Sequence, residues 1–271
     1  RILERSYRRG SALGVLGLSD VPPSHPRYAS LKTREKVVEG VERGITGLNG
    51  LVAQGRGEAL DYFIGERTTA PGEEAERAAA AMLLLAERPV LSVNGNAAAL
   101  VPEEMVLLAK KIDAPIEVNI FYRTEERVKK IADLLRSLGA ETVYGEEPDA
   151  VIPGLDHARA KAARGGIFDA DVVFVPLEDG DRCEALVRMG KLVISVDLNP
   201  LSRTARTSTV TIVDNVVRAL PNLISMVDEM ADLDEAKLKL FLEGYDNRAV
   251  LRRSVEEMIF HLSGQFSAFD G

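Results

Sequence analysis

The fold is decided by the stretch Pro89-Val90-Leu91-Ser92-Val93-Asn94-Gly95-Asn96, a short apolar run that ends abruptly in a polar loop. Similar apolar runs recur along the chain at 116–120, 142–144, 171–175, 192–196 and 209–213. Helical patterns lie between most of them, and short apolar strands alternating with helices are typical of a parallel sheet covered on both faces. We therefore predict an α/β fold, a Rossmann-like, doubly wound and mainly parallel sheet with added N- and C-terminal helices.

The segments on either side of this core are expected to be helical or irregular. Residues 1–26, which end in a Pro-rich turn, are expected to form an N-terminal arm. Residues 27–271 are expected to form one domain, with a helical N-terminal part at 27–88, the core at 89–215 and C-terminal helices at 216–271. Within 27–88 we predict helices at about 31–51 and 72–87, with a Gly-rich break at 54–58. The last helix carries an apolar stripe, which packs either on the chain's own core or on a second subunit.

The composition limits the class of protein. The 271 residues include 34 basic and 42 acidic side chains, and the net charge of −8 argues against binding to nucleic acid. The single cysteine, Cys183, excludes an intramolecular disulfide and a cysteine-rich metal site. No apolar run approaches the roughly 18 residues that a membrane span requires. We expect a cytoplasmic protein whose partners are small molecules.

Polar residues follow several of the predicted strands. Asn94 and Asn96 follow the first, an acidic loop at 178–181 follows the strand at 171–175, and Asp197 follows the strand at 192–196. The carboxyl ends of parallel strands meet at one edge of a sheet, where open α/β folds bind their ligands. Each residue has a structural alternative, because asparagine forms turns and acidic residues cap helices, and the acidic loop could equally hold Mg²⁺.

Arg56 lies between Gly55 and Gly57, where glycine lets backbone approach a ligand and a guanidinium suits phosphate oxygens. Arg34 stands at a predicted helix start, and a helix N-terminus together with an arginine makes a good anion site. The dinucleotide-binding glycine fingerprint and the Walker-type P-loop are both absent, so any nucleotide is held in another way. The three histidines show no metal-ligand spacing.

Several segments together carry a resemblance over roughly residues 21 to 225. They are Ser24-His25-Pro26-Arg27-Tyr28, Thr33-Arg34-Glu35-Lys36, Gly55-Arg56-Gly57-Glu58-Ala59, Ser92 through Pro102, Arg123-Thr124-Glu125-Glu126-Arg127, Ile152-Pro153-Gly154-Leu155, Pro176 through Arg182, Asp197 through Arg203, and Ile212-Val213-Asp214-Asn215. In this combination the chain resembles the archaeal 4-phosphopantoate–β-alanine ligases, also called phosphopantothenate synthetases. One position departs from the family pattern, which has a histidine where this chain has Gln54.

The resemblance implies an ATP-dependent ligase of coenzyme A biosynthesis. Such an enzyme joins 4-phosphopantoate to β-alanine through an acyl-adenylate, uses ATP and Mg²⁺, and releases 4′-phosphopantothenate, AMP and pyrophosphate. Members of the family are homodimers. The nucleotide-binding positions implied for this chain are Arg34, Arg56, Asp197, Leu198, Asn199, Arg203, Thr204, Asn215 and Val216.

The remaining site residues are expectations from the chemistry. Electrostatic stabilisation of the phosphates is expected from Arg56. The group that takes the proton from the β-alanine amine is left open among Glu178, Asp181 and His25. For the acid substrate we expect Asn94 and Asn96 on the pantoate side and Arg123 and Arg182 at its 4-phosphate; the metal ligands are left unassigned. Two other functions stay open, a non-catalytic nucleotide-binding module and a dinucleotide-dependent oxidoreductase, although the missing glycine fingerprint argues against the second.

Overall fold

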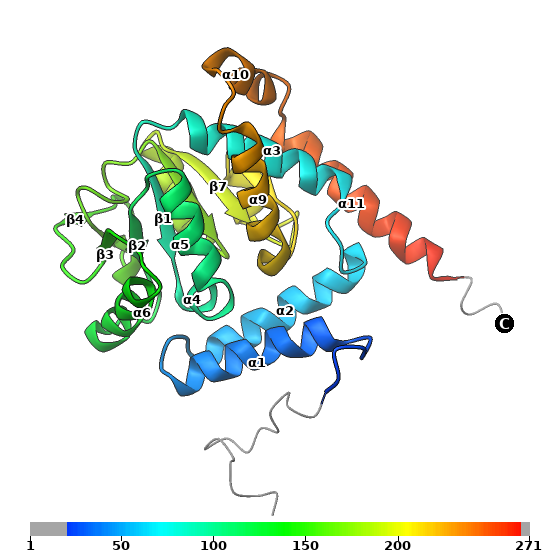
Figure 1. The fold of residues 1–271 in the computed structure, drawn as a ribbon, viewed down its shortest axis with the longest axis horizontal. Helices are drawn as coiled ribbons and strands as arrows, with labels where there is room; N and C mark the ends of the chain where they lie inside the picture. The colour runs from blue at the N-terminus through cyan, green and yellow to red at the C-terminus, as the bar shows by residue number, and fades with distance from the viewer. Residues whose placement is uncertain (1–20, 267–271) are drawn as a thin grey trace, which may run out of the picture.

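Six parallel strands form the central sheet in the structure, a computed structural model that describes residues 21–266 (Figure 1). Their order across the sheet is β3 (Val143–Tyr144), β2 (Ile116–Val118), β1 (Pro89–Val93), β6 (Val172–Pro176), β7 (Leu192–Val196) and β8 (Val210–Ile212). The chain starts in the middle at β1, runs outward to β3, and then returns to β6 on the other side of β1. The α/β doubly wound fold is thus confirmed, with a switch point between β1 and β6.

Both faces of the sheet are buried, which explains why the strands are continuously apolar. Leu91, Phe174 and Ile194 pack on one face, and their chain neighbours Val90, Val173 and Val193 pack on the other. The first face is covered by α3 (Ala70–Leu85), α5 (Pro102–Lys111), α6 (Glu125–Ser137) and α9 (Val216–Met230). The second face is covered by α7 (Gly180–Arg188) and the segment 150–170, which contains β4 (Ala150–Val151), η2 (Ala158–Ala160) and β5 (Lys161–Ala162).

Two N-terminal helices lie side by side next to the carboxyl edge of the sheet (Figure 1, blue). They are α1 (Tyr28–Glu42) and α2 (Leu48–Ile64), and they pack on α4 (Gly95–Leu100), which begins directly after β1. The Thr46 hydroxyl donates to Asn96 Oδ1 over 2.6 Å, and Asn96 Nδ2 donates to the Gly50 carbonyl over 3.0 Å. These bonds fix the start of α2 above the end of β1.

Three local predictions were wrong in this region. The single helix predicted at about 31–51 is two helices, because α1 ends at Glu42, before Gly44 with its left-handed φ of 72°, and α2 begins at Leu48. The break predicted at 54–58 is helical, because α2 continues to Ile64 and ends at Gly65, whose φ of 82° is left-handed. Each glycine costs a helix about 1 kcal/mol, but packing of α2 on its neighbours outweighs that preference. The loop predicted at 94–96 is the first turn of α4, where Asn94 Oδ1 caps the helix by accepting from the Ala97 N–H.

After α9 the chain ends with α10 (Glu235–Glu243) and α11 (Asn247–Gly264). A short helix, α8 (Arg203–Thr207), lies earlier, between β7 and β8. The predicted apolar stripe of α11 is divided: Leu251 and Met258 are buried on the chain's own core, whereas Ile259 is 59% exposed. Most of the predicted arm, 1–20, lies outside the described residues. In the part that is described, no helix is both long and apolar enough to cross a membrane.

Candidate functional site

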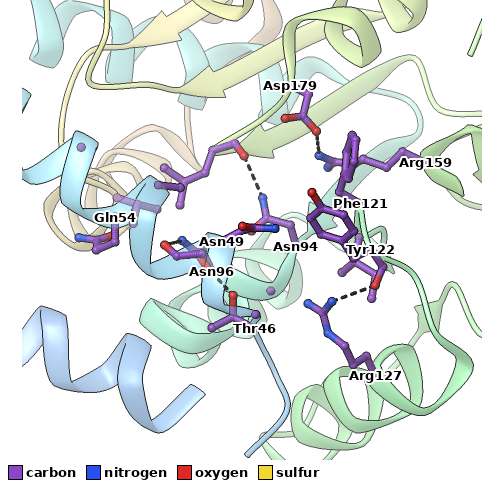
Figure 2. Close-up of a pocket in the computed structure, with 18 of the residues that line it drawn as sticks. Thr46, Asn49, Gln54, Asn94, Asn96, Phe121, Tyr122, Arg127, Arg159 and Asp179 are labelled. Carbon is purple, nitrogen blue, oxygen red and sulfur yellow. Dashed lines mark hydrogen bonds and ion pairs between the residues drawn. The ribbon is translucent and has the colours of Figure 1, made fainter. Parts of the chain in front are cut away.

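A pocket of about 380 Å³ opens at the carboxyl edge of the sheet, beside the switch point between β1 and β6 (Figure 2). Its wall combines the start of α2, the first turn of α4, the segments that follow β2, β6 and β7, and the start of α9. Side chains that are far apart in the sequence therefore meet here, at the edge where the sequence predicted a ligand site.

Two predicted substrate residues, Asn94 and Asn96, lie on this wall and also hold it together. Asn94 Nδ2 donates to the carbonyls of Pro176 and Leu177, each over 3.0 Å, and so ties the end of β1 to the end of β6. Asn96 makes the bonds to Thr46 and Gly50 already described. Gly50 must be glycine for this contact, because a Cβ there would lie 2.2 Å from Asn96 Oδ1.

Three charged side chains line the pocket in the described part of the chain: Arg127, Arg159 and Asp179. The Arg159 side chain is only 4% exposed and forms ion pairs with Asp179 and with Glu178, the latter over 2.9 Å. Arg127 donates to the main-chain carbonyl of Tyr122 over 2.8 Å (Figure 2). The pocket can therefore present both positive and negative charge to a ligand.

Behind this wall lies a buried ion-pair network that contains two predicted site residues, Glu178 and Arg182. Their side chains are 1% and 0% exposed, and they form an ion pair with each other. Arg182 also donates to Ser92 Oγ over 3.3 Å, and Glu178 accepts from Arg159 as well. Burial lowers the pKa of Arg182, and the nearby Glu178 carboxylate opposes that shift. Neither residue lines the pocket; Glu178 holds Arg159 from behind, and Arg182 in turn pairs with Glu178.

The predicted nucleotide residues divide into two groups. Leu198, Asn215 and Val216 line the pocket. Asn215 caps α9 and donates from Nδ2 to Asp61 over 2.8 Å, which fixes its orientation. Asp197, Asn199 and Thr204 form the adjoining turn instead: Asp197 accepts from the Asn199 N–H over 2.9 Å, and the Thr204 hydroxyl donates to the Glu178 carbonyl over 2.9 Å. Burial raises the pKa of Asp197, and the hydrogen bonds from Ser202 and the Asn199 N–H oppose that shift. Arg56, also predicted for the nucleotide, is exposed on α2 and lines neither this pocket nor the second one described below.

The predicted arginines Arg34 and Arg203 lie outside that pocket. Arg34 lines a second pocket, of about 460 Å³, between α1 and α2, where its Nε donates to Glu58 over 2.7 Å. The hydrogen bond from Arg34 lowers the pKa of Glu58 to about 2. Gln54 lines both pockets, so the two are neighbours. Arg203 is more than half exposed and lies 3.6 Å from Glu184.

The other predicted site residues lie near the pocket or away from it, but not on its wall. Asp181 contacts His157 Nε2 over 2.8 Å, and the His157 ring stacks at 5.2 Å on Phe121, which does line the pocket. Burial raises the pKa of Asp181, but the contacts with His157 and the Arg182 N–H together outweigh it, and the net shift is downward. Arg123 donates to the Gly145 carbonyl. His25 is exposed at the start of α1, where its Nδ1 accepts from the Arg27 N–H.

Two pocket residues were missed as candidates. Arg159 belongs to the irregular stretch before β6, where the sequence shows no periodicity to place a side chain. Arg127 falls within one of the segments that carry the resemblance, but helical periodicity alone makes it a surface residue of α6. Within residues 21–266 no group of three or more His, Cys, Asp and Glu side chains has an arrangement that could hold a metal ion.

Comparison with known proteins agrees with this picture. The model of the family described as phosphopantothenate/pantothenate synthetase matches residues 71–261. A 4-phosphopantoate–β-alanine ligase of Thermococcus onnurineus is 55% identical over 243 residues, which are 89% of this chain and 92% of that protein. Proteins of the same name from Thermococcus kodakarensis and Methanosarcina mazei are 54% and 53% identical, over 90% of this chain and 92% and 96% of their own lengths.

Proposed function

The chain belongs to the phosphopantothenate/pantothenate synthetase family, and from that premise we propose that it is a 4-phosphopantoate–β-alanine ligase of coenzyme A biosynthesis. The reaction joins 4-phosphopantoate to β-alanine at the expense of ATP and gives 4′-phosphopantothenate, AMP and pyrophosphate. The observation that carries the proposal is the pocket at the switch point of the sheet. It brings Asn94 and Asn96 together with Leu198, Asn215 and Val216, which the resemblance assigns to the nucleotide.

We propose that ATP lies at the end of the pocket formed by Leu198, Asn215 and Val216. Gly57 of α2 also lines this end of the pocket. A Cβ at this position would lie 3.5 Å from Leu198 Cδ1, and because glycine has no Cβ, α2 leaves that space to a bound nucleotide. Arg56 is exposed on the same helix, and we propose that its guanidinium binds the phosphate oxygens of ATP. Mg²⁺ binds nucleotide phosphates in most ATP-dependent enzymes, and we propose that it arrives with ATP.

The first chemical step activates the acid. A carboxylate is a poor electrophile, so its oxygen attacks the α-phosphorus of ATP, the bond to pyrophosphate breaks, and a mixed acyl-phosphate anhydride forms. The barrier is largely electrostatic, because negative charge gathers on the phosphates. Arg56 is the residue proposed to offset that charge. Asn94 and Asn96, in the middle of the wall, are proposed to position the pantoyl group.

In the second step the amine of β-alanine attacks the acyl carbon and AMP leaves. The ammonium must first lose a proton, and the acceptor has to lie within reach of the pocket. Asp179 is the one acidic side chain on the pocket wall in residues 21–266, and we propose it as the group that binds the ammonium and receives the proton. Glu178 is enclosed by two arginines, and Asp181 is bonded to His157, so both are proposed to support the site rather than to touch the amine.

The direct test is to incubate the purified protein with ATP, Mg²⁺, 4-phosphopantoate and β-alanine and to measure AMP. We expect AMP release that requires both co-substrates. Binding of ATP without AMP release would favour the non-catalytic nucleotide-binding module, and binding of NAD(H) would favour the oxidoreductase.

The family resemblance also leads us to propose a homodimer located in the cytoplasm. Sedimentation velocity tests the dimer, which predicts a species of about twice the mass of one 29.5 kDa chain. The exposed side of α11, with Ile259 and Phe260, is a candidate contact surface for it.

A further inference from the structure

Asn215 lines the pocket at the end proposed for ATP, and two neighbours fix the orientation of its side-chain amide. Its Oδ1 accepts from the Val217 N–H over 3.3 Å and so caps α9. Its Nδ2 donates to Asp61 Oδ2 over 2.8 Å. A rotation of the amide by 180° would turn Oδ1 toward the Asp61 carboxylate and Nδ2 toward the Val217 N–H, so both bonds would be lost.

The fixed amide leaves one proton for a ligand. Within residues 21–266, the acceptor that bonds to Asn215 Nδ2 is Asp61. An amide nitrogen carries two protons, so the second one is free to bind an oxygen or nitrogen acceptor of a molecule in the pocket. Asn215 is therefore held as a donor toward the nucleotide for as long as Asp61 accepts from it.

Asp61 belongs to α2 and is itself held by Arg218 of α9, at a place where α2 and the start of α9 face each other (Figure 1). Its side chain is only 6% exposed. Arg218 donates to both of its oxygens, to Oδ1 over 2.5 Å and to Oδ2 over 3.2 Å. Two parallel bonds from a guanidinium fix a carboxylate in direction as well as in distance. Asp61 therefore meets Asn215 from a fixed position.

The charge of Asp61 is not needed to neutralise Arg218. Asp214 also accepts from Arg218, over 2.9 Å at Nε, so two carboxylates share one guanidinium. No second cation forms an ion pair with either carboxylate in the part of the chain described. A second buried carboxylate adds a desolvation cost. In return, an ionised carboxylate has only acceptor oxygens, so it can hold Asn215 in one orientation and not in the other.

We propose that Asp61 is a positioning residue for the nucleotide, which keeps the Asn215 amide as a hydrogen-bond donor toward bound ATP. Asp61 lines neither pocket, so it acts through Asn215 and does not touch the ligand. The identity of the ligand as ATP rests on the proposed function.

The informative variant is Asp61→Asn, because it keeps the size of the side chain and changes the polarity of one end. The shorter bond from Arg218 is to Oδ1, so the remaining oxygen is expected to stay there and the new amino group to face Asn215. Two donors then meet, and the Asn215 amide loses its bond or rotates. We expect the Kd for ATP, measured by isothermal titration calorimetry, and KM for ATP to rise about 3- to 10-fold. The kcat at saturating ATP is expected to stay within about twofold of wild type.

A double-mutant cycle distinguishes positioning from a general loss of stability. In an Asn215→Ala background there is no amide to orient, so Asp61→Asn is expected to change the Kd for ATP by less than about twofold. Thr68→Val is the matched control, because the Thr68 hydroxyl donates to Asp214 over 2.6 Å in the same cluster and forms no bond with Asn215. It is expected to lower the melting temperature and to leave the Kd for ATP unchanged.

Two results would overturn the inference: a wild-type Kd for ATP in Asp61→Asn, or an equal rise with and without the Asn215 amide. If Asp61→Asn does not fold, the exchange variant Asp61→Asn/Asn215→Asp is measured instead. It keeps the number of charges and one hydrogen bond between the two positions, but reverses the direction of that bond and removes the donor from the pocket wall. We expect its Kd for ATP to rise at least tenfold, and wild-type affinity would refute the role equally.

The binding measurements separate this inference from the proposed function. If wild type binds ATP with this dependence on both residues but releases no AMP, the ligase proposal fails and the positioning role of Asp61 stands. If AMP is released but Asp61→Asn binds ATP like wild type, the positioning role is refuted and the ligase stands.

Discussion

Replacing Glu178 by glutamine tests whether this carboxylate acts in the chemistry or in the framework. Glu178 forms the ion pair of the fully buried Arg182, and it also contacts Arg159, which keeps a second partner in Asp179. The substitution preserves shape and removes one charge. It therefore leaves Arg182 as a buried cation with no carboxylate partner in the described part of the chain.

The expected loss of stability follows from that geometry. Breaking a buried pair by removing one partner costs about 3–5 kcal/mol, since the remaining charge stays desolvated. In a chain of this size each kcal/mol lowers the melting temperature by about 2–4 °C, so a decrease on the order of 6–20 °C is expected. Arg159 loses only one of its two partners, and it adds little to this figure.

Thermal unfolding of Glu178→Gln at pH 7, followed by circular dichroism, provides the measurement. The control is Glu184→Gln on α7, the helix that begins two residues after Glu178. Its partners Arg188 and Arg203 are both more than half exposed, so the substitution is expected to change stability by less than about 1 kcal/mol. A Glu178→Gln protein that melts like wild type but no longer releases AMP would refute this reasoning and return Glu178 to the list of proton acceptors.

Four further substitutions have defined outcomes. Gly50→Ala should lower stability by about 1–3 kcal/mol, despite the better helix propensity of alanine, because its Cβ would overlap Asn96 Oδ1; urea unfolding measures this. Glu76 is fully buried and its pKa is raised to about 8 from 4.5, so the folded state binds the extra proton between these values and stability should fall as pH rises from 5 to 9. Glu76→Gln should abolish this pH dependence, which changes the free energy of unfolding by a few kcal/mol at most. An equal pH dependence in both proteins would contradict the assignment. Arg56→Ala should abolish AMP release while changing stability by less than about 0.5 kcal/mol, because Arg56 is exposed. Gln54→His should change kcat by less than about tenfold, since Gln54 already supplies a donor and an acceptor at the same place; a gain of activity from an inactive wild type would instead support the non-catalytic module.

The fold was predictable because its strands have a sequence pattern that helices do not share. A strand buried on both faces, such as β6, is apolar at every position, and no surface helix has that pattern. The helix α2 was harder, because Gly55 and Gly57 have low helix propensity and only packing on α1, α4 and α11 makes that segment helical. Local preference predicts an element correctly when the tertiary environment agrees with it, and here it did not.

The site was predictable only where a strand end defined it. Asn94 and Asn96 could be placed because they follow β1 directly, and the topology then brings them to the ligand-binding edge. Nothing in the sequence distinguishes Arg159, which lines the pocket, from Arg182, which is buried behind it. That difference depends on the path of the irregular segment before β6, which pattern and spacing do not determine.

The hydrogen bonds of the two asparagines have a consequence for what the pocket can recognise. Both amide protons of Asn94 are taken by the carbonyls of Pro176 and Leu177, so toward a ligand this side chain can act only as an acceptor, through the remaining lone pair of Oδ1. Asn96 donates one amide proton to the Gly50 carbonyl, and its second amide proton can still be donated to a ligand. Two chemically identical side chains, two residues apart, thus have opposite polarity: the first suits a hydroxyl or an ammonium and the second a carboxylate or an ester oxygen. An exchange of either asparagine for aspartate would remove the donors that fix α4 in place, and the pocket would lose this polarity together with its shape.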